Sequence, residues 1–170
     1  MSCSGLPGGV RSISEPKFIV DHNVGKLARW LRLMGYDTLF FDGEDDSTMV
    51  AIALDEGRVI LTRDTQIMKR RVVTSGQLRA ILLQSDRPEL QMRYVIDTLH
   101  LNPEYNPFSI CLECNEPLVA RDKGELKDLV PPYVFETQEH YMECPACHRV
   151  YWRGMHWQAM MGRLAEFGNS

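Results

Sequence analysis

The sequence lacks several features that would place it in a specialised class. It has no apolar run of the roughly 18 residues that a membrane-spanning helix requires. Residues 1–16 contain no apolar segment typical of a secretory signal, so we expect a flexible tail there. There is also no internal repeat and no glycine-rich phosphate loop. With 44% hydrophobic and 25% charged residues, the composition is ordinary for a globular protein without a membrane segment.

Positive charge is not in excess either. The formal net charge is −4, and it is unevenly distributed. Residues 1–100 contain 13 basic and 13 acidic side chains, whereas residues 101–170 contain 6 and 10. Because nucleic-acid-binding proteins are often basic overall, this balance argues against a large, passive binding surface for nucleic acid. The neutral half can still hold local fields of either sign.

Cysteine is too sparse for a small secreted protein held together by disulfides. Four of the five cysteines form two C-x-x-C pairs, Cys111 with Cys114 and Cys144 with Cys147. Cys3 stands alone in the expected tail and receives no role. The pattern favours a metal site in a reducing intracellular compartment such as the cytoplasm.

The two cysteine pairs predict one structural zinc ion in a zinc ribbon. Zinc prefers a tetrahedron of thiolate or imidazole ligands, and each C-x-x-C turn supplies two sulfurs. The 29 residues between the pairs leave room for a few short strands. The alternatives are two disulfides, free thiols, or His148 in place of one cysteine. Four cysteine ligands leave no open position on the ion, so this zinc would be structural rather than catalytic.

Residues 17–104 have the pattern of an α/β domain with a mostly parallel sheet. Short apolar runs, typical of strands covered on both faces, lie at residues 17–20, 38–41, 58–62 and 80–84. Segments with helical signals alternate with them, at residues 26–34, 48–56, 65–71 and 88–99. This alternation predicts parallel strands that are joined by helices.

A stretch rich in proline and asparagine marks the expected boundary near residue 104. We expect residues 105–170 to form the zinc-ribbon module. Its short β-prone segments lie at residues 133–135, 141–142 and 149–152, and a closing helix is expected at residues 155–167.

Three aspartates are expected at one edge of the sheet. Asp21 and Asp64 each follow the C-terminal end of a predicted strand, and Asp46 begins a helix after another strand. Ligands bind at this edge of an open parallel sheet. If the strands before Asp21 and Asp64 are neighbours, the carboxylates converge and would repel one another without a cation. Mg²⁺ or Mn²⁺ suits such oxygen ligands and can promote phosphodiester hydrolysis.

Each aspartate also has an ordinary structural interpretation. Asp46 and Asp64 are good helix N-caps, and Asp21 can begin an Asx-turn with Asn23. Weaker candidates for the same edge are Asp42, Asp45 and Asp86. The nearby basic side chains could hold phosphates or could simply form solvated faces. They are Lys26, Arg29, Arg63, Lys69, Arg70 and Arg71.

Several short motifs follow one another in a recognisable order. They are DHN at 21–23, LARWLR at 27–32, GYD at 35–37, DD at 45–46, GRVILTRD at 57–64, CLECN at 111–115 and CPACHRVYW at 144–152. Together they resemble the Mut-seven C-terminal RNase domain family, which is similar to PIN nucleases and carries a zinc ribbon. The resemblance covers about residues 17–157 and includes both parts in order. It implies a compact, PIN-like three-layer α/β/α domain followed by a small C-terminal zinc ribbon.

The resemblance also implies roles for individual residues. It maps an acidic site for catalytic Mg²⁺ or Mn²⁺ onto Asp21, Asp46 and Asp64. Asn23 and Thr62 match positions that support this site by orienting carboxylates or water. A full PIN site commonly has four acidic residues, of which three are assigned in this chain.

We therefore expect a metal-dependent ribonuclease that hydrolyses RNA phosphodiester bonds. Lys26, Arg29 and Arg63 would position the RNA backbone, and the ribbon would extend the binding surface. The family often has an acidic residue where this chain has His22, so the alternative is a catalytically weak or inactive module that binds RNA or protein. His156 also matches a recurrent position, for which we expect a role in packing the ribbon against the nuclease part.

Overall fold

A computed structural model describes residues 15–168 of the chain. Its larger part is built on four parallel strands: β1 (Lys17–Asp21), β2 (Thr38–Phe41), β3 (Arg58–Thr62) and β4 (Ala80–Leu82). They lie in the order β2-β1-β3-β4, so β1 and β3 are central neighbours. The predicted α/β class with a parallel sheet is therefore confirmed, and the strand residues agree closely with the apolar runs. The first 14 residues, which include most of the expected tail and Cys3, lie outside the described part.

Helices connect the strands and cover both faces of the sheet. The connections contain the short 3-10 helix η2 (His22–Val24), α2 (Lys26–Leu33), α3 (Asp46–Glu56), α4 (Thr65–Met68) and α5 (Arg71–Thr74). Helix α6 (Pro88–Leu99) follows β4, with its proline in the first turn as expected. Gly57 ends α3 in the left-handed conformation, at φ 67°, where glycine is the preferred residue.

The side chains of β1 show how the layers are held together. Phe18 and Val20 belong to the larger core, which also contains residues of α2 and α6, whereas Ile19 belongs to a second core with residues of α3 and α4. Successive side chains of a strand point to opposite faces, so one strand contributes to both cores. The sheet is therefore the middle of three layers, as expected.

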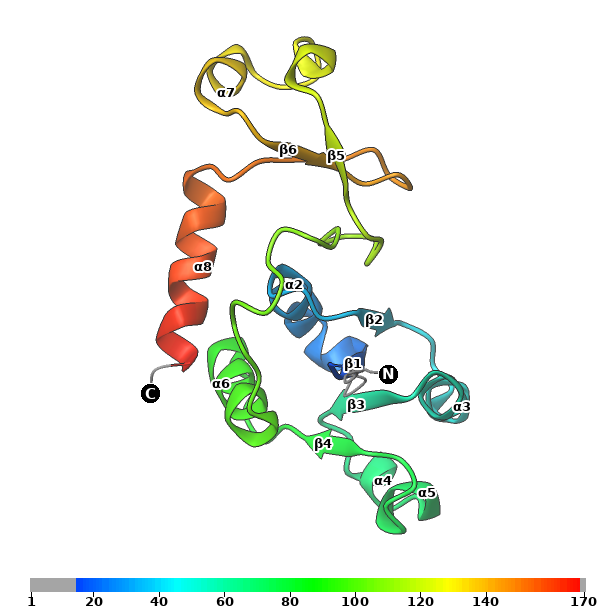
Figure 1. The fold of residues 1–170 in the computed structure, drawn as a ribbon. Helices are drawn as coiled ribbons and strands as arrows, with labels where there is room; N and C mark the ends of the chain where they lie inside the picture. Colours follow the sequence, from blue (N-terminus) through cyan, green and yellow to red (C-terminus); the bar gives the residue numbers. More distant parts are fainter. Residues whose placement is uncertain (1–14, 169–170) are drawn as a thin grey trace, which may run out of the picture.

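The C-terminal part contains a small antiparallel sheet. Strands β5 (Val119–Arg121), β6 (Tyr141–Glu143) and β7 (Val150–Tyr151) are joined in that order. The 3-10 helix η3 (Lys123–Leu126) and helix α7 (Pro132–Thr137) lie between β5 and β6. Figure 1 shows this sheet and α7 at one end of the molecule and the parallel sheet at the other.

The last helix, α8 (Met155–Gly168), returns to the α/β part and packs beside α6. Its residues Leu164 and Phe167 are buried in the same core as Phe18 and Val20. The Phe167 ring also meets the Trp30 ring edge-on, with 5.8 Å between the ring centroids. The closing helix thus brings residues from near the C-terminus into one core with residues of β1. The division into domains near residue 104 remains a prediction.

Two expected elements differ from the structure. Residues 133–135 were expected to be β-prone but lie in α7. Pro132 occupies the first turn of this helix, a position that proline favours, and this start signal prevails over the β propensity of the side chains that follow. The expected single helix at residues 65–71 is two short helices, α4 and α5. Within the described residues, no helix is long and apolar enough to cross a membrane.

Candidate acidic site and cysteine cluster

The acidic site begins where β1 and β3 end. Asp21 is the last residue of β1, and Asp64 lies two residues after β3. These strands pair in parallel, with Val20 opposite Leu61, so both carboxylates lie at the C-terminal edge of the central strand pair. The expected convergence of Asp21 and Asp64 required β1 and β3 to be neighbours, and they are.

Asp21 is held in place by two hydrogen bonds. The hydroxyl group of Thr62 donates to its Oδ2, and the backbone N–H of Asn23 donates to its Oδ1 at 3.0 Å. The second bond is the expected Asx-turn, and it caps η2. Asp21 is only 6% exposed, so these donors fix a carboxylate that bulk water barely reaches. Its buried oxygens are satisfied by hydrogen bonds, as a stable buried carboxylate requires.

Thr62 links Asp21 to Asp64. Its side chain is fully buried, and its Oγ1 accepts a hydrogen bond of 2.9 Å from the backbone N–H of Asp64. Asp64 in turn accepts a 2.8 Å bond from the backbone N–H of Gln66 and caps α4, as its helix-cap interpretation predicted. One oxygen of Asp64 is thus engaged in the cap.

Asp46 has a different position from the one expected of a cap. The N-cap of α3 is Asp45, which accepts bonds from the backbone N–H of Ser47 at 2.9 Å and from the hydroxyl of Thr48 at 2.8 Å. The interpretation of Asp46 as the N-cap was therefore wrong. Because Asp45 already satisfies the helix start, the carboxylate of Asp46 is available at the edge of the sheet.

The three predicted aspartates influence one another electrostatically. Partial burial, the charge of Asp64 and a hydrogen bond with Asp64 raise the pKa of Asp46, and the charge of Asp21 adds to this. Arg70 acts in the opposite direction on the same group. Arg70 therefore offsets the effect of burial and of the two neighbouring carboxylates only in part, and a bound cation would stabilise the charge further.

The aspartates meet in pairs rather than as one tight group. Among residues 15–168, the four cysteines are the group of three or more metal-binding side chains whose ligand atoms lie close enough to share an ion. Asp46 and Asp64 are within hydrogen-bonding reach of each other, while Asp21 acts on Asp46 through space. This set of carboxylate oxygens suits Mg²⁺ or Mn²⁺ chemically.

A cleft of about 550 Å³, which we call the basic cleft, lies next to Asn23. Lys26 and Arg29 from α2 line it, as does Asp86, which follows β4. Asp21, which precedes His22 and Asn23 in the chain, is not among its lining residues, and neither are Asp46 and Asp64. Arg63 is exposed, and its guanidinium donates to the carbonyl oxygen of Gln84 at 3.4 Å. The structure thus places two of the three predicted phosphate-binding residues in one cleft and leaves Arg63 outside it.

Some residues of the basic cleft were not among the site residues predicted from the sequence. Arg32, Gln91 and Glu113 come from α2, α6 and the first C-x-x-C turn, and tertiary packing alone brings them together. His22, at the position where the family often has an acid, also lines this cleft. Because Glu113 forms an ion pair with Arg29, the cysteine part of the chain closes one side of the cleft.

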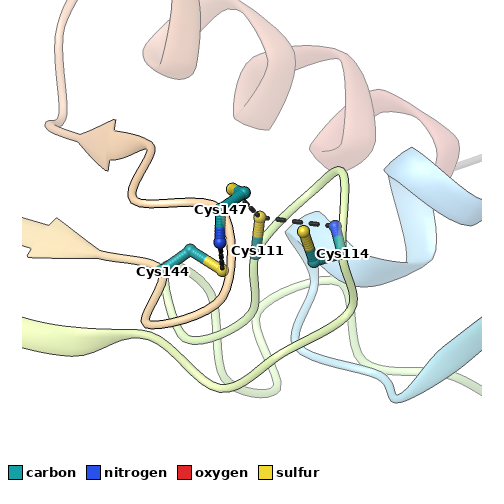
Figure 2. A group of neighbouring side chains, drawn as sticks. All are labelled: Cys111, Cys114, Cys144 and Cys147. Atoms are coloured by element: carbon teal, nitrogen blue, oxygen red, sulfur yellow. Dashed lines mark hydrogen bonds between the residues drawn. The ribbon is translucent and has the colours of Figure 1, made fainter.

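The four predicted zinc ligands form the second site. Their sulfur atoms all lie within 4.8 Å of one another, and Figure 2 shows the side chains pointing toward a common centre from two turns. The sulfurs of Cys111 and Cys147 are 3.7 Å apart. A tetrahedron with metal–sulfur bonds of about 2.3 Å has sulfur–sulfur edges of about 3.8 Å, so this spacing fits zinc.

Backbone groups also prepare the cysteine cluster for an ion. In each C-x-x-C turn, the backbone N–H of the second cysteine points at the sulfur of the first, at 3.4 Å in both turns. The hydrogen bond with Cys147 raises the pKa of Cys114 to about 12, whereas the backbone N–H of Arg149 lowers that of Cys147 to about 7. Without an ion, the cluster can hold only part of its charge, and a divalent cation would stabilise the thiolates.

The first C-x-x-C turn is attached to the α/β part through polar contacts. The buried Arg32 donates to the carbonyl oxygen of Leu112 at 2.8 Å, and Asn115 accepts from the backbone N–H of Thr38 at 2.9 Å. Asn115 also donates to Asp37 at 2.6 Å. Burial opposes ionisation of Asp37, but hydrogen bonds from Arg58 and Asn115 outweigh it and lower the pKa of Asp37. The cysteine cluster is thus fixed to the edge strand β2.

The fold and the two sites define a class of protein, an α/β domain with carboxylates at the end of a parallel sheet and an attached four-cysteine ribbon. The sequence matches the Mut7-C RNAse domain over residues 16–164. The chain therefore belongs to the Mut7-C RNAse domain family, as the motifs predicted. No curated protein and no solved structure shows significant similarity to it.

Proposed function

We propose that this chain is a metal-dependent ribonuclease whose acidic site consists of Asp21, Asp46 and Asp64. The observation that supports the proposal is the position of Asp21 and Asp64 at the edge where the paired strands β1 and β3 end, with Asp46 within hydrogen-bonding reach of Asp64. Burial and the charges of the other two carboxylates raise the pKa of Asp46 there. Membership of an RNase domain family supports the reaction class. A bound Mg²⁺ or Mn²⁺ would supply activation of water and stabilisation of charge on the phosphate.

The protein's own groups have distinct parts in this proposal. Thr62 and the backbone N–H of Asn23 hold Asp21 in one orientation, so that its carboxylate is prepared before a cation arrives. Lys26 and Arg29 hold the phosphates of a single strand in the basic cleft. Zinc in the four-cysteine site is a structural ion, since its four sulfurs leave no position for a substrate.

Cleavage of a labelled single-stranded RNA in the presence of Mn²⁺ tests the proposal. We expect Asp21→Asn and Asp64→Asn to lower the rate at least about 100-fold, because each removes a charge that holds the cation. Asp55→Asn is the matched control, since Asp55 is exposed in the last turn of α3, at the opposite end of that helix from Asp46, and it should cleave like wild type. Equal rates in all four proteins would refute the nuclease assignment.

The same assay addresses the alternative, a binding module without catalysis. Asp86, a candidate for the fourth acid, lines the basic cleft and is not among the groups that shift the pKa of Asp46. An acidic site with three carboxylates instead of four is the observation that most favours a binding module. A binding module would retain RNA without Mg²⁺ or Mn²⁺ and would release no cleavage product when either ion is added.

A further inference from the structure

A second cleft adjoins the basic cleft. It has a volume of about 210 Å³, and both clefts are lined by Arg29 and Leu112. We call it the aromatic cleft, because β7 and the start of α8 contribute the remaining wall. Its principal side chains are Tyr151, Trp152, Met155, His156 and Trp157. The two clefts are therefore neighbours that share Arg29 and Leu112 as lining residues.

The chemistry of the two clefts is complementary. The basic cleft contains Lys26, Arg29 and Arg32 together with two acids, whereas no acidic residue of the described chain lines the aromatic cleft. Arg29 stands at the junction and carries the positive charge of the aromatic cleft. An RNA strand matches this pair of clefts, because it has charged phosphates next to flat, weakly polar bases.

The walls of the aromatic cleft are accessible to a ligand. Met155 is 85% exposed, His156 is exposed, and Trp152 is only half-buried. A side chain at position 154 would place its Cβ 3.0 Å from Nε1 of Trp152, which is closer than most real contacts. Gly154 therefore leaves Trp152 in its place as a wall of the cleft.

Arg29 is also able to meet a phosphate. It is paired with Glu113, but the side chains of both residues are nearly half exposed. Such solvent-exposed ion pairs contribute little to stability, so a phosphate can compete with Glu113 for the guanidinium. Phosphate contacts position a strand, and they leave its bases free to turn toward neighbouring surfaces.

We propose that the aromatic cleft binds one unpaired nucleobase of an RNA strand whose phosphates lie along Lys26 and Arg29. Unpaired bases stack on aromatic and histidine side chains and on guanidinium groups, and this cleft offers all of these. The inference rests on RNA being the ligand in the proposed function. It gives the cysteine ribbon and α8 a direct part in holding the strand.

Equilibrium binding without Mg²⁺ or Mn²⁺ tests this inference independently of cleavage. The ligands are a labelled oligouridylate and an abasic oligomer of the same length, measured by fluorescence anisotropy on zinc-loaded protein. The double variant Met155→Ala, His156→Ala should bind the oligouridylate at least about fivefold more weakly than wild type, because a stacking surface is lost. Its affinity for the abasic oligomer should not change.

Two further variants separate base contacts from other effects. Tyr133→Ala removes an aromatic side chain that is 71% exposed on α7 and lines neither cleft, so it should bind like wild type. Lys26→Ala should weaken binding of both oligomers, since it removes a phosphate contact. The inference would be overturned if the double variant preferred the oligouridylate over the abasic oligomer as strongly as wild type does. Equal affinity of wild type for both oligomers would also overturn it.

The outcome for the nuclease assignment is read separately. Base-dependent binding that the double variant weakens, without any Mn²⁺-dependent cleavage, supports the aromatic cleft and refutes the ribonuclease. If cleavage depends on Asp21 but wild type binds both oligomers equally well, the ribonuclease assignment is supported and the aromatic cleft is refuted as a base-binding site.

Discussion

Asp45 and Asp46 are adjacent in the sequence but have opposite surroundings. Hydrogen bonds from the hydroxyl of Thr48 and the backbone N–H of Ser47 lower the pKa of Asp45. Burial and the neighbouring charge of Asp64 raise the pKa of Asp46. A carboxyl group whose pKa is higher in the folded state binds its proton more tightly there than in the unfolded chain. Ionisation of Asp46 therefore destabilises the metal-free fold.

We expect the Asp46→Asn variant to be more stable than wild type in the absence of Mg²⁺ and Mn²⁺. Wild-type stability should fall as pH rises through the raised pKa of Asp46, and the variant should lack this contribution. The melting temperature, followed between about pH 4 and pH 7, measures the effect. Added Mn²⁺ should raise the melting temperature of wild type but not of the variant, because a ligand that binds only the folded state stabilises it.

Asp45→Asn is the control for this comparison. Asparagine caps helices about as well as aspartate, so the free energy of unfolding should stay close to that of wild type. The response to Mn²⁺ should also persist. If both variants lose that response, or if Asp46→Asn is less stable than wild type without metal, Asp46 does not act as a member of the acidic site.

At the scale of elements, the two C-x-x-C turns have the same backbone but different attachments. Asn115 and His148 each follow the second cysteine of their turn, at φ 64° and 63°. The carboxamide of Asn115 bonds to Thr38 and Asp37 of the α/β part. The largely exposed His148 contacts Glu143 within its own module, at 3.2 Å. The first turn is therefore the one that joins the cysteine cluster to β2.

Asn115→Gly should lower the free energy of unfolding by about 1–3 kcal/mol, the usual cost of leaving buried hydrogen-bonding groups without partners. Glycine accepts a positive φ without strain, so the variant isolates the side-chain bonds. Urea denaturation measures the change. His148→Gly makes the same backbone substitution in the other turn and should stay close to wild type. Equal losses in the two variants would mean that backbone effects, not the attachment to β2, determine the result.

The elements were largely predictable where local chemistry decides them. The apolar runs at β1 and β3 identify buried strands, and the run at β2 identifies the partly exposed edge strand. Asp64 likewise identifies the cap of the next helix, because each of these signals lies within a few residues. The cap of α3 was assigned one residue too late because Asp45 and Asp46 are equally good caps in sequence. Helix α7 was missed because its proline start competes with β-prone side chains, and the outcome depends on packing around Leu126 and Val130.

At the scale of the whole molecule, the sites depend on contacts between distant segments. The expected edge with Asp21 and Asp64 follows from strand order, which topology rules restrict strongly. The basic and aromatic clefts do not follow from the sequence, since Arg29 meets Glu113, 84 residues away, only after the ribbon is attached to α2. The orientation of α8 on α6 likewise depends on buried residues at both ends of the chain.

The chain order of the elements makes the cysteine cluster important for the entire fold. The cysteines lie between α6 and α8, and α8 contributes Leu164 and Phe167 to the main core. An ion that closes the cluster therefore shortens the effective connection between two helices that pack on each other. Loss of the ion should loosen α8 as well as the ribbon.

We expect wild type to contain one zinc ion per chain and Cys111→Ser to contain none. The melting temperature of the variant should fall by at least about 5 °C, because zinc binding contributes directly to folding free energy. Elemental analysis and thermal unfolding measure these two effects. Amide hydrogen exchange should become faster in α8, which follows the second C-x-x-C turn in the chain and depends on the ribbon for its position. Cys3→Ser, which alters the fifth cysteine of the sequence and leaves both C-x-x-C pairs intact, should retain zinc and stability. Full zinc content in Cys111→Ser, or unchanged exchange in α8 after zinc loss, would show that the cluster does not support the fold in this way.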